Sequence, residues 1–142
     1  MYKPPFTPGR QNVKDGIMYE VTIIKSFSAA HLLADIGGKC EELHGHNFQV
    51  EVTVGADTLN SEGIAVDFRV VKRWLKEVLD AMDHRHLNEL PFFAGKSPSS
   101  ENIACHIYQE MAAKVHEAGV KMQRVKVWES ENAAVTYREE KG

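Results

Sequence analysis

The sequence has little of three things that mark particular classes of protein: cysteine, long apolar runs and an excess of one charge. Its 142 residues include two cysteines, which argues against a disulfide-stabilised scaffold. No apolar run approaches the roughly 20 residues that a membrane-spanning helix needs. The formal net charge is -3, and the Lys and Arg residues form no stripe. We therefore expect neither a nucleic-acid partner nor a membrane partner.

The start of the chain also lacks the apolar core of a signal peptide, because residues 1–17 are rich in Pro, Gly and polar side chains. The patterned sequence begins at Met18. We therefore expect a cytoplasmic protein with a flexible extension over 1–17 and a single domain over 18–142. Its 43% hydrophobic and 26% charged residues are typical of an ordinary globular domain.

The sequence does contain a cluster of metal-binding residue types. His44 and His46 flank Gly45, and His31 lies upstream of them. Zinc prefers nitrogen and sulfur donors, and its catalytic sites use three protein ligands with a fourth position open. If His44 and His46 open a strand, their spacing of two puts both rings on the same side. The pattern predicts a catalytic zinc site formed by His31, His44 and His46.

Cys40, between these histidines, has two interpretations. A nearby cation would lower the pKa of its thiol from about 8.5 and make it a reactive thiolate base. Alternatively, Cys40 is a fourth ligand of a purely structural site. The spacing Cys-x3-His-x-His does not match the paired spacing of common structural sites, which favours the base.

Three further acidic positions are candidates. Asp83 directly precedes His84, and a carboxylate beside an imidazole can orient it and raise its basicity; the alternative is a helix-end pair with no catalytic role. Glu129 ends a predicted strand and could accept two hydrogen bonds from a flat donor edge, or it could be an exposed strand-end charge. Glu101 is by default a first-turn acid favoured by the helix dipole.

Alternating and helical patterns predict four strands and two helices in the order ββααββ, an antiparallel α+β domain. In the third strand, Met122 and Arg124 are expected to face away from Val125 and Val127. The predicted ranges are strands at 18–28 and 47–55, a helix at 68–82 after an Asp67 cap, a mostly loop segment at 83–97, a helix from a Ser99 cap to Gly119, and strands at 120–129 and 134–138.

Six short segments together resemble the 6-pyruvoyl-tetrahydropterin synthase family, over about Tyr19 to Arg138. The resemblance is closest to the bacterial 6-carboxytetrahydropterin synthases of queuosine biosynthesis, because Cys40 stands only four positions before His44. The six segments are Phe27–His31, Cys40–His46, Gly63–Phe68, Asp83–Asn88, Pro98–Asn102 and Val127–Glu129.

The resemblance implies a tunnelling fold (T-fold), in which subunits join into an oligomeric barrel. The expected assembly is a homohexamer of two stacked trimers, with active sites at subunit interfaces. The resemblance also implies a role for each candidate residue. These roles are zinc ligands for His31, His44 and His46, the base for Cys40, proton-transfer partners from a neighbouring subunit for Asp83 and His84, the pterin anchor for Glu129 and, more weakly, a place near the pterin pocket for Glu101.

The implied activity is that of a zinc-dependent lyase. It would convert 7,8-dihydroneopterin triphosphate to 6-carboxy-5,6,7,8-tetrahydropterin, with release of triphosphate and acetaldehyde. Two alternatives stay open. One is a 6-pyruvoyl-tetrahydropterin synthase, which stops after loss of triphosphate and an internal redox rearrangement, and the other is a non-catalytic zinc- or pterin-binding protein.

Overall fold

The computed structural model describes residues 16–34 and 38–140 of the chain, without the side chains of Lys39 and Cys40. The N-terminal extension expected over 1–17 therefore lies almost entirely outside the described residues. The candidate metal ligands all fall inside them, and so does the range 18–142 expected for the domain, apart from residues 35–37 and 141–142.

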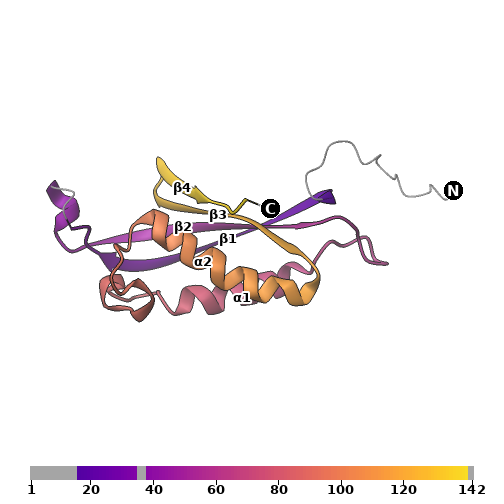
Figure 1. The fold of residues 1–142 in the computed structure, drawn as a ribbon, viewed down its shortest axis with the longest axis horizontal. Helices are drawn as coiled ribbons and strands as arrows, with labels where there is room; N and C mark the ends of the chain where they lie inside the picture. Colours follow the sequence, from indigo (N-terminus) through magenta and orange to yellow (C-terminus); the bar gives the residue numbers. More distant parts are fainter. Residues whose placement is uncertain (1–15, 35–37, 141–142) are drawn as a thin grey trace.

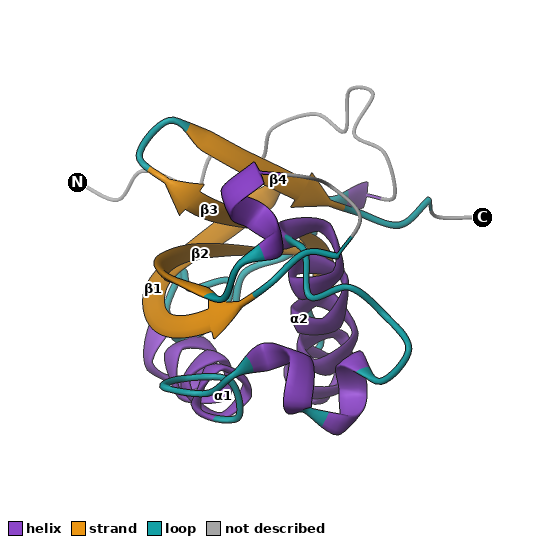
Figure 2. Ribbon diagram, turned by 90° about the vertical axis from the view of Figure 1, so that its left-hand side faces the viewer, coloured by secondary structure: helices purple, strands orange, loops and turns teal. Residues whose placement is uncertain are grey.

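A four-stranded antiparallel sheet forms one layer of the molecule, as predicted, and two helices form the other. Both helices lie against the same face of the sheet (Figures 1 and 2). Along the chain the elements follow one another as β1, β2, α1, α2, β3 and β4, and the spatial order of the strands is β1-β2-β3-β4. The bounds are Tyr19–His31 (β1), His44–Ala56 (β2), Phe68–Asp80 (α1), Ser100–Val115 (α2), Lys121–Ser130 (β3) and Ala133–Tyr137 (β4).

The alternation in β2 produces the buried face of the sheet. Phe48, Val50, Val52 and Val54 all point toward the helices and are almost completely buried. Period-two spacing places them on one side of the pleat, and their β-branched or aromatic side chains suit a packed sheet surface. The hydrophobic core lies between this face of the sheet and the helices α1 and α2.

Both helices begin at the caps that the sequence predicts. The Asp67 carboxylate accepts a hydrogen bond from the backbone N–H of Arg69, and the Ser99 hydroxyl accepts one from the N–H of Asn102. These bonds satisfy amide donors that the first helical turn leaves unpaired. The cap of α2 matters for the site, because the residue before Ser99 is Pro98, whose carbonyl group contacts a candidate metal ligand.

The first strand is longer than expected, since β1 continues to His31 rather than ending at residue 28. The reason is its pairing with β2, which runs without interruption from Tyr19 opposite Ala56 to His31 opposite His44. The segment at 83–97, expected to be mostly loop, contains two short 3-10 helices, Leu87–Glu89 and Pro91–Phe93. Pairing partners far along the chain, which local patterns do not reveal, decide such boundaries.

The expected arrangement of β3 is wrong for Met122. It is buried in the core on the same side as Val125 and Val127, not with Arg124 on the other face. The pairing of β2 with β3 shifts register between Thr53 and Val54, which is the irregularity of a β-bulge. An inserted residue reverses the side to which the following side chains point, so simple alternation fails there.

The second face of the sheet carries mainly polar groups in the described residues. Arg124 pairs with Glu20 at 2.8 Å, and the indole N–H of Trp128 donates to Glu51 at 2.6 Å.

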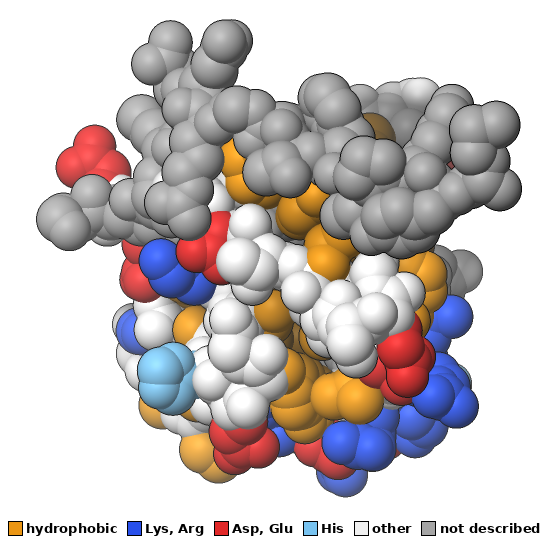
Figure 3. Space-filling view, turned by 90° about the vertical axis from the view of Figure 1, so that its right-hand side faces the viewer, with side chains coloured by type: hydrophobic (Ala, Val, Ile, Leu, Met, Phe, Trp, Pro, Cys, Tyr) orange, Lys and Arg blue, Asp and Glu red, His pale blue; other side chains and the backbone are white. Residues whose placement is uncertain are grey.

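The end of the molecule that carries Leu59 and Ile64 exposes hydrophobic side chains (Figure 3). Among the described helices, none has the length and apolarity to cross a bilayer.

Candidate metal centre

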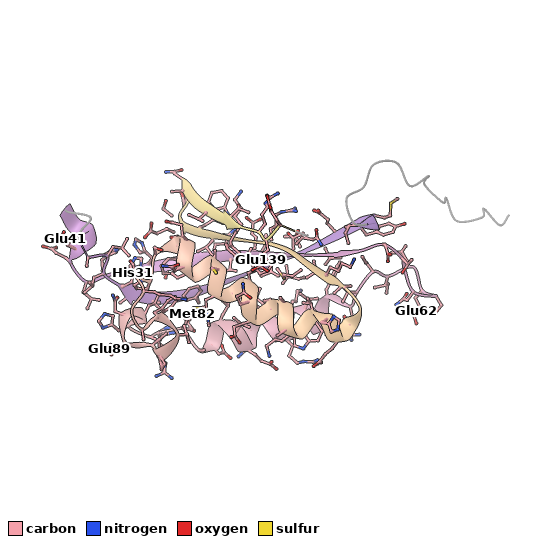
Figure 4. All side chains as sticks on the ribbon, in the orientation of Figure 1. His31, Glu41, Glu62, Met82, Glu89 and Glu139 are labelled. Atoms are coloured by element: carbon pink, nitrogen blue, oxygen red, sulfur yellow. The ribbon has the colours of Figure 1, made fainter. Side chains whose placement is uncertain are left out.

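Strand register brings three histidines together at one end of the sheet. His31 pairs with His44 across β1 and β2, and His46 is the next residue of β2 on the same face. Glu129, near the end of β3, joins them, and one potential ligand atom from each of the four residues lies within 4.8 Å of the other three. His31 lies toward the end of the molecule that carries Glu41 and Glu89, away from Glu62 (Figure 4). Sequence-predicted ligands from separate strand ends therefore meet in space.

Phe48 forms the apolar floor of this cluster. Its ring stacks on Phe27 with 5.0 Å between centroids, and it meets the rings of His31 and His46 edge-on at 5.5 and 5.4 Å. Phe48 is fully buried. Edge-on packing against a rigid buried ring restricts the orientations that an imidazole can adopt. The core of the domain thus continues into the site and helps to aim its nitrogen atoms.

The hydrogen bond of His31 assigns its tautomer. Nδ1 lies 2.8 Å from the Pro98 carbonyl oxygen, which can only accept, so Nδ1 carries the proton. In the neutral ring, Nε2 is then unprotonated and carries a lone pair. His31 is completely buried, and its Nε2 has no hydrogen-bond partner among the described residues. A buried imidazole with one nitrogen oriented by a carbonyl group and the other free has the usual arrangement of a metal ligand.

His44 is oriented in the same way. Its Nδ1 lies 2.7 Å from the carbonyl oxygen of Glu42, which directs Nε2 toward the cluster. His46 Nε2 is also buried without a hydrogen-bond partner in the described part of the chain. Burial lowers the pKa of His46, with Glu129 opposing and the other two histidines adding to the effect. The neutral form, which alone can bind a metal, is therefore favoured.

Glu129 supplies negative charge to the cluster. Its Oε1 lies 3.3 Å from His31 Nε2 and 3.1 Å from His46 Nε2. A carboxylate oxygen this close to two imidazole nitrogens is stabilised by a positive charge between them, either a metal ion or a proton on a ring nitrogen. Three imidazole nitrogens and one carboxylate oxygen are donors that suit a divalent transition metal. The residues of the cluster thus fit a metal ion, and His31, His44, His46 and Glu129 could hold it.

The candidate base lies outside the part of the site that can be described. Cys40 belongs to a short 3-10 helix, Gly38–Glu41, in the connection that leads from β1 into His44. Its side chain is not among the described groups. The role of Cys40 remains a prediction from the sequence.

Asp83 and His84 form a pair at the outer edge of β1. Asp83 Oδ1 lies 3.0 Å from His84 Nδ1 and accepts a hydrogen bond from the backbone N–H of Ser28 at 2.9 Å. The Ser28 amide, followed by the contact with His84, lowers the pKa of the Asp83 carboxyl. His84 has a left-handed backbone, with φ of 58°, and its ring is 82% exposed. The Asp83 carboxylate thus orients a His84 ring that is open to solvent.

This pair does not contact the histidine cluster of its own chain in the described residues. Both nevertheless border a shallow hollow of about 490 Å³, whose lining includes His46 and His84. Glu101 lies exposed on the first turn of α2 and does not join the metal cluster. The structure thus brings together the three histidines and Glu129, and it leaves Asp83, His84 and Glu101 apart from them.

Sequence reasoning missed two orienting groups because both are backbone carbonyls, of Pro98 and Glu42. No residue type marks them in the sequence. It also missed that Glu129 lies within the cluster. One signal in the sequence points to this position. Glu129 follows Val125 and Val127 at a spacing of two along the strand, which places it on the face of the sheet toward which the histidines point.

Comparison with known proteins finds relatives over most of the chain. The profile of the family described as 6-pyruvoyl tetrahydropterin synthase matches residues 20–140. The chain is 39% identical to 6-carboxy-5,6,7,8-tetrahydropterin synthase of Synechocystis sp., over 79% of this chain and 87% of that protein. It is 33% identical to human 6-pyruvoyl tetrahydrobiopterin synthase, over 81% of this chain and 88% of the human protein.

A solved structure shows the same fold. The 6-pyruvoyl tetrahydropterin synthase of Caenorhabditis elegans superposes with a TM-score of 0.76 and 28% sequence identity, covering 87% of this chain and 99% of that one. The residues matched by the family profile include His31, His44, His46 and Glu129. From the profile match and these identities, the chain belongs to the 6-pyruvoyl tetrahydropterin synthase family.

Proposed function

We propose that the protein is a zinc-dependent lyase that converts 7,8-dihydroneopterin triphosphate to 6-carboxy-5,6,7,8-tetrahydropterin, releasing triphosphate and acetaldehyde. The observation that carries the proposal is the oriented set of imidazoles in His31, His44 and His46, whose ligand atoms lie within 4.8 Å of one another and of Glu129, with His31 fully buried. Relatives named 6-carboxy-5,6,7,8-tetrahydropterin synthase, 33% and 39% identical, support this choice of product.

The three histidines would hold zinc and leave a coordination position for a hydroxyl group of the substrate side chain. When bound there, zinc supplies Lewis acidity that makes the neighbouring C–H groups of the side chain more acidic. The chain itself contributes the orientation of the ligands, through the carbonyl groups of Pro98 and Glu42. Cys40 would take and return protons at the side-chain carbons as a thiolate.

Asp83 and His84 would act as a second proton-transfer group. The carboxylate holds the His84 ring by Nδ1, so Nε2 is free to give or take a proton. Loss of triphosphate from the side chain, addition of one water molecule and a retro-aldol-type cleavage between the first two side-chain carbons would then release acetaldehyde and leave the carboxyl group on the pterin. Glu129 would bind the flat donor edge of the pterin ring, for which two carboxylate oxygens are well suited.

The active unit would be a homohexamer of two trimers with sites at subunit interfaces. Two observations support this assembly. Asp83 and His84 face solvent and do not contact the histidine cluster of their own chain in the described residues, so a neighbour could receive them. The sheet also has two edge strands, β1 and β4, and β1 exposes Ile24 on the face away from the helices. Edge strands offer backbone groups to a second copy of the chain.

Mass analysis of the products from 7,8-dihydroneopterin triphosphate tests the proposal. We expect acetaldehyde, triphosphate and a carboxy pterin in equal amounts. A 6-pyruvoyl pterin without acetaldehyde would instead assign the activity named for the human relative. Binding of the substrate with no turnover would leave only a capture function. Either result would overturn the proposed reaction.

A further inference from the structure

The outer edge of β1 is closed over its last residues by the segment that carries the acid–base pair. The Ser28 N–H donates to the Asp83 carboxylate, and the Ser28 carbonyl oxygen accepts from the His84 N–H at 2.6 Å. Two residues further on, the Ala30 N–H donates to the carbonyl oxygen of Arg85 at 3.0 Å. The segment is thus bonded along the edge of β1 at every second residue.

Asn88 completes this series with two bonds to one residue. Its Oδ1 accepts from the Leu32 N–H at 3.0 Å, and its Nδ2 donates to the Leu32 carbonyl oxygen at 3.1 Å. The side-chain amide therefore uses one donor and one acceptor on the same backbone, as a paired strand would. Asn88 is half-buried and follows the fully buried Leu87, which anchors it to the core.

The bonded residue, Leu32, directly follows His31. The Leu32 N–H belongs to the peptide group that joins His31 to Leu32. A hydrogen bond that holds this N–H therefore also restrains the backbone of His31, the candidate ligand. His31 is then held from two directions, by Asn88 through the main chain and by Pro98 through ring Nδ1. β1 ends at this residue, and a strand end without such bonds opens readily.

We propose that Asn88 is a positioning residue that fixes His31 for metal binding and couples it to the segment bearing Asp83 and His84. This inference rests on the proposed metal site. Groups that orient metal ligands from outside the coordination sphere commonly change affinity by about 10-fold to 100-fold. Asn88 acts one peptide away from the ring, so we expect an effect near the lower end of that range.

The competing interpretation is that Asn88 only stabilises a turn. Asn60 offers a matched control, because its Oδ1 accepts from the backbone N–H groups of Glu62 and Ile64 at 2.9 and 3.0 Å. Those two bonds hold a loop at the opposite end of the molecule from His31 (Figure 4). Asn60→Ala thus removes two hydrogen bonds from an asparagine side chain to the backbone, both accepted by Oδ1, without touching the metal site.

The experiment is titration of the metal-free, full-length protein with Co²⁺ alone, followed by visible absorption, in wild type, Asn88→Ala, Asn88→Asp and Asn60→Ala. Co²⁺ reports ligand geometry through its d–d bands, which Zn²⁺ lacks because its d shell is full. Wild type and Asn60→Ala should bind one Co²⁺ with the same spectrum. Asn88→Ala should bind roughly tenfold more weakly, with altered bands.

Asn88→Asp separates geometry from charge. A carboxylate there would attract a cation more strongly, yet it cannot donate to the Leu32 carbonyl, so we expect weaker Co²⁺ binding in spite of the added charge. This variant also decides the question if Asn88→Ala does not fold. Equal affinity and spectra in wild type and the Asn88 variants, or an equal loss in Asn60→Ala, would overturn the inference alone. No Co²⁺ binding by folded wild type would overturn the proposed function itself.

Discussion

Glu129 and His46 meet from different strands, with Oε1 of the carboxylate 3.1 Å from Nε2 of the imidazole. The same oxygen lies 3.3 Å from His31 Nε2. Without a cation, this places a negative charge against nitrogen atoms that have no hydrogen-bond partner in the described residues. Glu129 therefore occupies the position where either a fourth metal donor or a substrate group would enter.

Replacing Glu129 with Gln separates these two roles. If Glu129 anchors the pterin, Glu129→Gln keeps one zinc per chain and binds the substrate more weakly, because the amide cannot accept two hydrogen bonds from the ring edge. Metal content and KM measure the two effects. Glu131→Gln, in the exposed turn after β3, is the control. Loss of zinc in Glu129→Gln would make Glu129 a metal ligand instead.

His44→Ala tests the histidine cluster. The variant loses one of three nitrogen donors, so stoichiometric zinc should be lost while the fold is retained, because His44 lies at the partly exposed start of β2. Elemental analysis and circular dichroism check the two outcomes. His116→Ala removes an exposed histidine beyond α2 and should keep its zinc. Full zinc content in His44→Ala would remove this residue from the site.

Cys40→Ala tests the catalytic base. We expect turnover to fall by roughly 10² to 10⁴, the usual contribution of a positioned acid or base, with zinc still bound. Rate and metal content are measured on the same sample. Cys105→Ala is the control: Cys105 lies half-buried in α2, where its thiol contacts Tyr137. Unchanged turnover in Cys40→Ala would contradict the proposed mechanism.

Asp83→Asn removes the carboxylate whose pKa is lowered in the folded protein, and so tests what that carboxylate contributes to stability. A carboxyl group whose pKa is lower in the folded protein than in the unfolded chain stabilises the fold above its unfolded pKa, near 3.8. This contribution is lost as the pH falls through the lowered folded pKa. Urea unfolding at several pH values should show wild type more stable than Asp83→Asn at pH 6, and the difference should shrink below about pH 4. A difference independent of pH would contradict the assignment.

The sequence allowed most of this site to be predicted because the decisive information is local. His44 and His46 are two residues apart in a strand with clear alternation, which by itself puts both rings on the face of Phe48. His31 follows from the pairing of two consecutive strands. The N-caps Asp67 and Ser99 could also be predicted, since a capping side chain satisfies amides only two or three residues away.

What could not be predicted depends on pairing between distant segments. The bulge that turns Met122 into the core arises where β3 meets β2, and nothing in the local sequence marks it. Glu129 reaches the histidines only through that same pairing. The hydrogen bonds between Asn88 and Leu32 join residues 56 positions apart. No residue type in the sequence marks the N–H and carbonyl groups of Leu32 as the partners of Asn88.

In the proposed function, the three imidazoles of His31, His44 and His46 hold a catalytic zinc ion. Elemental analysis of the full-length protein, purified without chelators, tests it most directly. We expect one equivalent of zinc per chain in wild type, removed by a chelator together with the activity and restored with it by added Zn²⁺. Folded protein that carries no zinc, takes up none and still turns over dihydroneopterin triphosphate would contradict it.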